Sequence, residues 1–197
     1  SDGNELTLAE IMARADGGIM GWQQRYSGAA TTVLGSQADD EIRDYTGESV
    51  TVRARDNDDS VSLAVGDDIV SAGSGQDYVD TGDGDDLIAG ERGDDQLNGR
   101  QGDDVFVFNY GDGQDVLFVA EGLDTLSFGP DITVDMLTVA FDSEDRLLLF
   151  IDGGAGGSIS LGDAALDNQA GIAERLQFVD AEGHTRVFDF VGWVRGN

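Results

Sequence analysis

The sequence of 197 residues contains no cysteine and no lysine. Without cysteine the chain can form neither a disulfide bond nor a thiolate metal site. Without lysine it lacks the side chain that P-loop phosphate binding and Schiff-base catalysis require. If such a chain is extracellular, its stability must come from another source than disulfides, and metal ions are the obvious candidate.

Several familiar sequence signals are also missing. The longest wholly aliphatic or aromatic run is Leu147–Ile151, which is too short to span a membrane, and no secretory signal is visible. The H-E-x-x-H, G-x-S-x-G and G-x-G-x-x-G motifs do not occur. The only histidine, His184, lies in an expected turn, where we predict a solvated side chain without a catalytic partner. These absences favour a protein that is not an enzyme.

The charges are almost entirely of one sign. Forty acidic residues stand against eleven arginines, for a formal net charge of −29 at pH 7. Such a surface repels nucleic acid and anionic membranes and attracts cations or basic partners. Because a compact chain with this charge also repels itself, we expect bound cations to neutralise part of it.

A nine-residue repeat organises the middle of the chain. Its glycines are Gly66, Gly75, Gly84, Gly93 and Gly102. Two residues after each glycine stands an aspartate, in the order Asp68, Asp77, Asp86, Asp95 and Asp104. Two residues further on stands an apolar residue, in the order Val70, Val79, Ile88, Leu97 and Phe106. Catalysis by a glycosidase needs one pair of carboxylates, so the regular recurrence argues against that function.

Less regular copies precede the repeat. The stretch Asn57–Val61 keeps its phase, with Asn57 in the glycine position, because asparagine also adopts left-handed backbone conformations. Ala38–Ile42 and Gly47–Thr51 resemble degenerate copies that are one residue out of phase. Downstream, the nine-residue step resumes in two further copies after a slip of two residues at Asn109–Tyr110. These copies are Gly113–Leu117 and Gly122–Leu126.

Eighteen residues, or two repeats, can close one turn of a solenoid with two parallel sheets, since nine residues cannot bury both faces of a sheet. The apolar residues of the repeats would then point inward, and strands one turn apart would lie about 4.8 Å from each other. Aspartates one turn apart would stack in two rows. One row would hold Asp59, Asp77 and Asp95, and the other Asp68, Asp86 and Asp104.

Such rows of carboxylates need a counter-charge. Unit charges about 5 Å apart repel each other by roughly 1 kcal/mol even in water. A hard divalent cation between turns removes this repulsion, and carboxylate and carbonyl oxygens suit Ca²⁺. In the doubled aspartates we predict that the second residue, such as Asp86, is the ligand. The first, such as Asp85, is expected to form the turn and face solvent.

The stretch Gly73–Gly99 resembles three tandem copies of the nonapeptide G-G-x-G-x-D-x-U-x of RTX (haemolysin-type) calcium-binding proteins. The resemblance implies a parallel β-roll, with Ca²⁺ held between turns by aspartates and by carbonyls of the glycine-rich half. The implied metal-binding residues are Asn57, Asp59, Gly66, Asp68, Gly73, Gly75, Asp77, Gly82, Asp83, Gly84, Asp86, Arg92, Gly93, Asp95, Gln101, Gly102 and Asp104. Thr81, Glu91 and Arg100 depart from the motif's glycines, and we expect weaker binding in those turns.

The chain after residue 109 has strand-like segments separated by turns rich in glycine and aspartate. These segments are Met136–Phe141, Arg146–Ile151, Ser158–Leu161, Arg175–Asp180 and Thr185–Phe190, and Asp180–His184 is predicted to be the hairpin turn between the last two. This part resembles the haemolysin-type calcium-binding-related domain, which commonly follows RTX repeats. The matching stretches are Tyr110–Leu117, Gly122–Ile132, Leu147–Gly153, Ser158–Leu161 and Glu174–Thr185. The resemblance implies a β-rich cap on the open end of the roll.

The first 35 residues have a different pattern. Thr7 and Glu10 form a capping box, and Gly17 is a natural helix stop, so a short amphipathic helix is expected between them. A loop is expected over Met20–Tyr26.

The sequence therefore predicts an all-β fold with an N-terminal helical cap and loop (1–35), a β-roll (36–108) and a C-terminal β-rich cap (109–197). The expected function is that of a calcium-binding module in a secreted, extracellular protein. It would fold on Ca²⁺ binding after type I secretion and stabilise a parent toxin, hydrolase or adhesin. Its start at Ser1 favours a piece of such a larger chain. The alternative is a calcium-stabilised adhesion or ligand-binding module.

Overall fold

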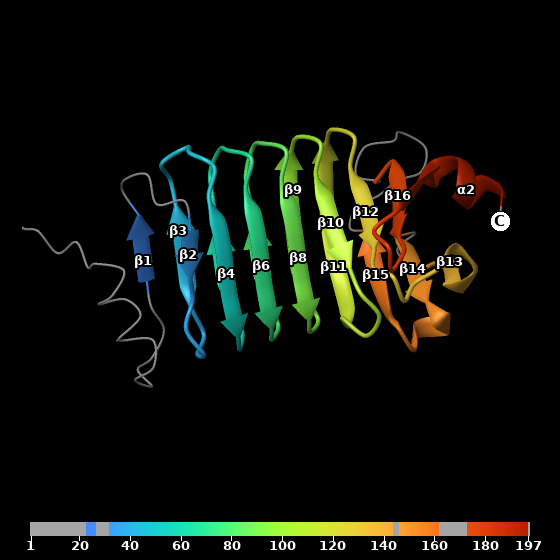
Figure 1. The fold of residues 1–197 in the computed structure, drawn as a ribbon, viewed down its shortest axis with the longest axis horizontal. Helices are drawn as coiled ribbons and strands as arrows, with labels where there is room; N and C mark the ends of the chain where they lie inside the picture. Colours follow the sequence, from blue (N-terminus) through green and yellow to red (C-terminus); the bar gives the residue numbers. More distant parts are fainter. Residues whose placement is uncertain (1–22, 27–31, 144–145, 162–172, 197) are drawn as a thin grey trace, which may run out of the picture.

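The computed structural model describes residues 23–26, 32–143, 146–161 and 173–196. Within them the chain winds into a solenoid whose strands alternate between two sheets and stack along the long axis (Figure 1). The predicted all-β solenoid is therefore confirmed. The predicted helix between Thr7 and Gly17 lies outside the described residues.

We name the two sheets A and B. In spatial order, sheet A contains β1 (Gln23–Tyr26), β3 (Glu41–Asp44), β5 (Ser60–Ser62), β7 (Tyr78–Asp80), β9 (Gln96–Gln101), β11 (Gln114–Glu121), β15 (Gly157–Leu161), β14 (Leu147–Ile151) and β13 (Leu137–Phe141). Sheet B contains β17 (Thr185–Asp189), β16 (Arg175–Val179), β12 (Thr125–Phe128), β10 (Val105–Phe108), β8 (Leu87–Arg92), β6 (Ile69–Ser74), β4 (Thr51–Asp56) and β2 (Thr32–Leu34).

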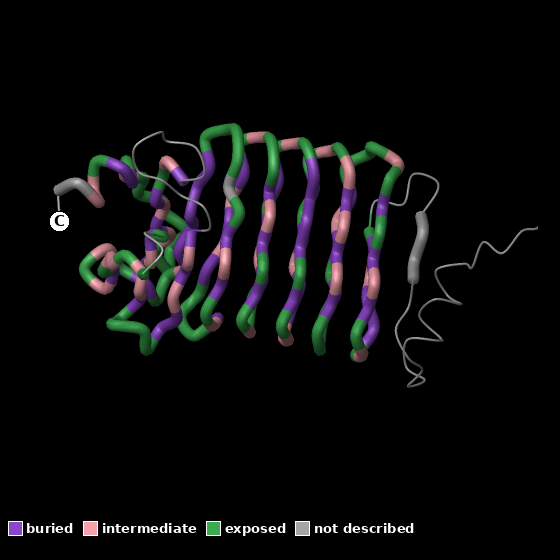
Figure 2. Tube along the Cα trace, turned by 180° about the vertical axis from the view of Figure 1, so that it is seen from behind, coloured by how far each residue is buried: buried purple, intermediate pink, exposed green. Residues whose placement is uncertain are grey.

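The register follows the eighteen-residue turn. In sheet A, Val79 pairs with Leu97, and in sheet B, Val70 pairs with Ile88, both in parallel ladders. All four side chains are at most 1% exposed, as are Val61 and Phe106. Figure 2 shows buried positions recurring on every turn, with exposed positions gathered where the chain reverses. The predicted inward-facing residues therefore form the core.

Two of the three predicted irregularities are confirmed. Gln96 pairs with Val116, so the turn after Asn109–Tyr110 contains twenty residues and the predicted two-residue slip is present. Glu41 pairs with Ser60, nineteen residues away, so the copy at Ala38–Ile42 is one residue out of phase.

The predicted phase of Gly47–Thr51 is wrong. Thr51 pairs with Ile69, which keeps the eighteen-residue offset and puts Val50 at the aspartate position. The inward-facing residue of this copy is Val52, which is fully buried. The reason is that burying the aliphatic side chain, rather than the position of Gly47, fixes the register.

The predicted loop over Met20–Tyr26 is wrong for its last four residues. Gln23–Tyr26 form β1, which pairs in parallel with β3. The strand β2 likewise pairs with β4. Paired strands therefore begin before residue 36, and these pairs satisfy backbone groups that would otherwise lie at sheet edges.

The C-terminal part extends both sheets of the solenoid, as the predicted β-rich cap requires. The strand β15 pairs in parallel with β11, and β14 and β13 continue sheet A in antiparallel fashion. The strand β16 pairs in parallel with β12, and β17 follows it after a hairpin. A short 3₁₀ turn at Val134–Met136 directly precedes β13, and another at Asp152–Gly154 directly follows β14.

A short helix, α2 (Phe190–Gly196), ends the described chain, where the sequence pattern predicted that the last strand would continue to Phe190. Phe190 is fully buried, and its ring stacks with that of Trp193 at 6.2 Å between centroids. No helix among the described residues is long and apolar enough to cross a membrane.

Candidate functional site

Buried aspartates stand at the start of the solenoid strands in two rows. Row A, before or within the strands of sheet A, comprises Asp40, Asp59, Asp77, Asp95 and Asp115. Row B, along sheet B, comprises Asp68, Asp86, Asp104 and Asp124. All nine residues are at most 5% exposed. The two predicted rows are therefore present, and the six predicted aspartates lie in them.

One oxygen of each carboxylate joins neighbouring turns. In row A, the backbone N–H of Asp59 donates to Oδ1 of Asp77 at 2.8 Å, and that of Asp77 donates to Oδ1 of Asp95 at 2.9 Å. In row B, the N–H of Asp68 donates to Oδ1 of Asp86 at 2.7 Å. Each row aspartate except Asp40 thus accepts a hydrogen bond from the turn that precedes it.

In four row aspartates the second carboxylate oxygen is buried and has no donor. The Oδ2 atoms of Asp59, Asp77, Asp86 and Asp95 are buried and accept no hydrogen bond from the described residues. A buried carboxylate oxygen without a partner is strongly disfavoured unless a proton or a cation meets it. Four such atoms at equivalent positions therefore point to a positively charged ligand.

The pKa values of the row aspartates agree with the absence of a donor at these oxygens. Burial raises the pKa of Asp59, Asp95 and Asp104 to about 7, and neighbouring carboxylates of the same rows add to the increase. The pKa of Asp77 and Asp86 rises to about 6, again chiefly through burial. Without a cation these side chains would hold protons close to neutral pH, so protons and cations would compete for the same oxygens.

Eight of the predicted carbonyl ligands fall into two groups. Those of Asp83, Arg92 and Gln101 accept N–H groups of glycines one turn earlier, at 2.8–2.9 Å. The carbonyls of the repeat glycines receive no hydrogen bond from the described residues, and this second group comprises Gly66, Gly75, Gly84, Gly93 and Gly102. The glycine carbonyls are therefore the better candidates for a metal ligand.

Close stacking explains why glycine occupies these turns. A Cβ atom on Gly84 would lie 2.1 Å from the carbonyl oxygen of Gly66, and Gly84 has a φ of +148°. Gly73 and Gly82 also have positive φ and lie against carbonyls of the previous turn. Asn57 adopts a φ of 74°, as predicted for an asparagine in the glycine position.

Non-glycine residues also adopt the left-handed conformation within the repeats. Glu91 has a φ of 68° and Arg100 a φ of 63° at positions where the motif has glycine. Arg100 forms a two-pronged ion pair with Asp80, with both contacts at 2.5 Å. This ion pair links β7 to β9 and offsets part of the backbone strain.

The first aspartate of each pair has a role that the sequence did not indicate. Asp85, Asp94 and Asp103 are exposed, as predicted. Oδ1 of Asp85 accepts the N–H of Asp103 at 2.8 Å, and Oδ1 of Asp103 accepts the N–H of Leu123 at 2.9 Å. These side chains therefore bond to the turn that follows, whereas the buried aspartates bond to the turn that precedes.

Three members of the rows were not predicted as ligands. Asp115 and Asp124 are 4% and 1% exposed, and burial raises their pKa to about 7 and about 6. Their signal was visible in the sequence, because both follow a glycine by two residues after the slip at Asn109–Tyr110. Asp40 begins row A, where it accepts hydrogen bonds from Ser36.

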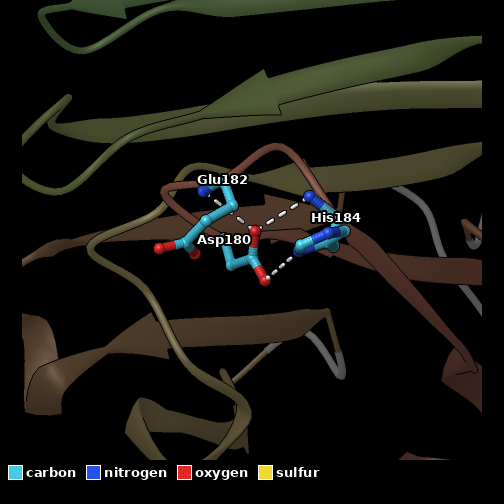
Figure 3. Close-up of side chains that lie close together, drawn as sticks. All are labelled: Asp180, Glu182 and His184. Carbon is cyan, nitrogen blue, oxygen red and sulfur yellow. Dashed lines mark hydrogen bonds and ion pairs between the residues drawn. The ribbon is translucent and has the colours of Figure 1, made fainter.

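A separate group of possible metal ligands lies in the β16–β17 hairpin turn and comprises Asp180, Glu182 and His184 (Figure 3). Oδ1 of Asp180 accepts the N–H groups of Glu182 and His184, and its Oδ2 lies 3.1 Å from Nδ1 of His184. The N–H of His184 is the chief cause that lowers the pKa of Asp180. The predicted turn and the exposure of His184 are confirmed, but the ring does have a partner. These contacts hold the turn together.

Comparisons with models of known protein families and with curated protein sequences give no match. The resemblance to RTX proteins therefore rests on the repeat residues themselves. What the fold establishes is the class: a parallel β-solenoid of the β-roll kind, with two rows of buried aspartates.

Proposed function

We propose that this chain is a calcium-binding β-roll module whose folding depends on Ca²⁺. The observation that carries the proposal is the set of buried Oδ2 atoms without hydrogen-bond donors at equivalent positions of successive turns. Oxygen is the only ligand type that the rows and their glycine carbonyls offer, and Ca²⁺ accepts six to eight oxygens in flexible geometry. Row aspartates and carbonyls of the repeat glycines would hold the ions.

The mechanism is a coupling between ion binding and folding. Without cations, the solenoid must bury carboxylates that repel one another and lack partners, which disfavours the folded state. Bound ions supply free energy to the folded state alone, about 4 kcal/mol for a site at a thousandfold excess over its dissociation constant. The chain would therefore remain unfolded at low calcium concentration and fold at high concentration.

This switch suits a protein that is exported before it folds. We propose that the module belongs to a secreted, extracellular protein, passes through type I secretion machinery as an unfolded chain, and stabilises a parent toxin, hydrolase or adhesin once outside. The resemblance of the repeat to RTX proteins and the net charge of −29 support this context. The module itself would not be an enzyme.

A ligand-binding or adhesion module is the alternative, and the surface gives it weaker support. A groove of about 840 Å³ crosses the outer face of sheet B, where Arg53, Arg55 and Arg92 lie beside Asp56 and Glu91. Because both signs of charge line this groove, it favours no single class of charged ligand. Calcium-dependent folding is therefore the function we propose.

Far-ultraviolet circular dichroism with and without Ca²⁺ tests this function. In chelator we expect little β signal, and addition of a few millimolar Ca²⁺ should restore it and raise the melting temperature. Mg²⁺ at the same concentration is the control, since it demands octahedral geometry and dehydrates reluctantly. Full β structure in chelator, with no change on adding Ca²⁺, would show that the proposal is wrong.

A further inference from the structure

Glu174 lies next to Asp124, the last aspartate of row B, at the corresponding position before strand β16. Strand β16 pairs with β12 so that Arg175 lies opposite Thr125. The residues just before this pair are Glu174 and Asp124, which therefore correspond across the sheet. Glu174 thus brings a carboxylate to the end of row B from fifty residues further along the chain.

The contacts of Glu174 repeat those within the rows. The N–H of Asp104 donates to Oδ1 of Asp124 at 3.0 Å, and the N–H of Asp124 donates to Oε2 of Glu174 at 2.8 Å. The N–H groups of Glu174 and Arg175 both donate to the carbonyl of Asp124, at 2.9 and 3.1 Å. Glu174 therefore continues the hydrogen-bonded ladder of row B by one carboxylate.

Asp124 also has one carboxylate oxygen without a hydrogen-bond donor among the described residues. It is 1% exposed, and its Oδ2 accepts no hydrogen bond from the described residues. Its turn contains Gly122, where an added Cβ would lie 1.8 Å from the carbonyl oxygen of Gly102, as in the repeats upstream. The carboxylate of Glu174 lies close enough to raise the pKa of Asp124, an effect that comes after that of burial.

Row A ends differently. The residue that β15 places opposite Asp115 is Ile159, which has no ligand atom on its side chain. At the other end, row A begins with Asp40 where the corresponding position of row B holds Val50. Each row thus contains five carboxylates once Glu174 is counted, and only row B takes one from the residue that precedes β16.

We propose that Asp124 and Glu174 form a further Ca²⁺ site at the junction of the roll and its C-terminal cap. This site rests on the proposed function, because it uses the same chemistry as the rows. An ion at this site would also link the C-terminal strands to the roll. Glu174 directly precedes β16, and its carbonyl accepts the N–H of Phe190 at the start of α2, at 2.8 Å. Ion binding at this point therefore fixes β16 and α2 against the roll.

Replacement of Glu174 by glutamine tests the site, because glutamine keeps the acceptor oxygen but removes the charge. Bound Ca²⁺ is counted by native mass spectrometry and titration calorimetry on the full chain, with Glu48→Gln, an exposed carboxylate outside both rows, as the matched control. We expect Glu174→Gln to lose one ion, or to bind one ion at least about tenfold more weakly. Glu48→Gln should bind as the wild type does.

Hydrogen–deuterium exchange at saturating Ca²⁺ provides a second readout. The backbone of β16, β17 and α2 should exchange faster in Glu174→Gln, while β5 to β9 keep their protection. Glu174→Asp, which keeps the charge, should recover most of the lost binding. An unchanged ion count and unchanged exchange in Glu174→Gln would overturn this site alone. A wild-type chain that binds no Ca²⁺ would overturn the proposed function as well.

Discussion

Two adjacent aspartates link each repeat to its neighbours in opposite directions. Oδ1 of Asp86 accepts the N–H of Asp68 in the preceding turn, and Oδ1 of Asp85 accepts the N–H of Asp103 in the following turn. Burial separates their roles, since Asp86 is 2% exposed and Asp85 faces solvent. Of the two, only Asp86 has a buried oxygen that is left without a donor.

Alanine substitutions should therefore have unequal effects within one pair. Asp86→Ala leaves the buried N–H of Asp68 without an acceptor, at a cost of about 1–3 kcal/mol, and also removes a metal ligand. Asp85→Ala removes one exposed hydrogen bond, at a cost of about 0.5–1 kcal/mol. Thermal unfolding and the calcium midpoint of folding measure the difference. Equal effects of the two substitutions would contradict the assigned roles.

Much of the residue-level picture could be predicted from spacing. The G-x-D step identified Asp77, Asp86 and Asp95 as ligand candidates, because a fixed period puts equivalent side chains at equivalent places. The hydrogen bonds of Asp85 could not be predicted, since they depend on the direction of backbone N–H groups in the next turn. Glu174 has no glycine two residues before it, and only the pairing of β16 with β12 reveals its position.

At the scale of elements, glycines allow the turns to stack as closely as the paired strands require. Gly84 has a positive φ and also faces the carbonyl of Gly66 one turn earlier. Gly111 has a φ of +87°, and nothing lies within 4 Å of the Cβ that it could carry. Both glycines thus have a positive φ that would strain a residue with a side chain, but they differ in packing.

Alanine at these two glycines should separate backbone strain from stacking. Gly111→Ala should lower the free energy of unfolding by about 1 kcal/mol, the usual cost of positive φ. Gly84→Ala should cost at least about 3 kcal/mol, because the turns must move apart to admit the methyl group. Urea denaturation in calcium-containing buffer measures both. A similar loss in the two variants would mean that close stacking does not hold the turns together.

Elements with their own local signal could be predicted, and those set by distant partners could not. The hairpin turn Asp180–His184 follows from its turn residues, and its backbone hydrogen bonds confirm it. The strand β1 has no strong signal and owes its pairing to β3. The register of Gly47–Thr51 was assigned from its glycine, although burial of Val52 decides it.

At the scale of the whole molecule, charge and burial oppose each other. Eight row aspartates have pKa values raised by burial to about 6 or 7, against 3.8 in an unfolded chain. Between about pH 4 and pH 7, the metal-free folded state therefore binds more protons than the unfolded state. Its stability must fall as the pH rises through this window.

The metal-free protein should accordingly be more stable at pH 5 than at pH 8. We expect a difference in unfolding free energy of at least about 1.4 kcal/mol, which corresponds to one pKa unit on one group. Calcium affinity should change in the opposite sense and increase with pH, because the ion requires ionised carboxylates. Circular dichroism of chelator-treated protein, titrated with a stabilising osmolyte to populate the folded state, and calcium titrations at both pH values test this. Greater metal-free stability at pH 8 would contradict it.

The alternation of repeats between two sheets has a consequence for how such modules change in length. Loss or gain of two repeats leaves every later strand in its own sheet and shifts the cap along the axis by one strand spacing, about 4.8 Å. Loss or gain of a single repeat moves every later strand to the opposite sheet and turns the cap through half a revolution. The number of repeats therefore determines both how far the cap stands from the first turn and which way it faces.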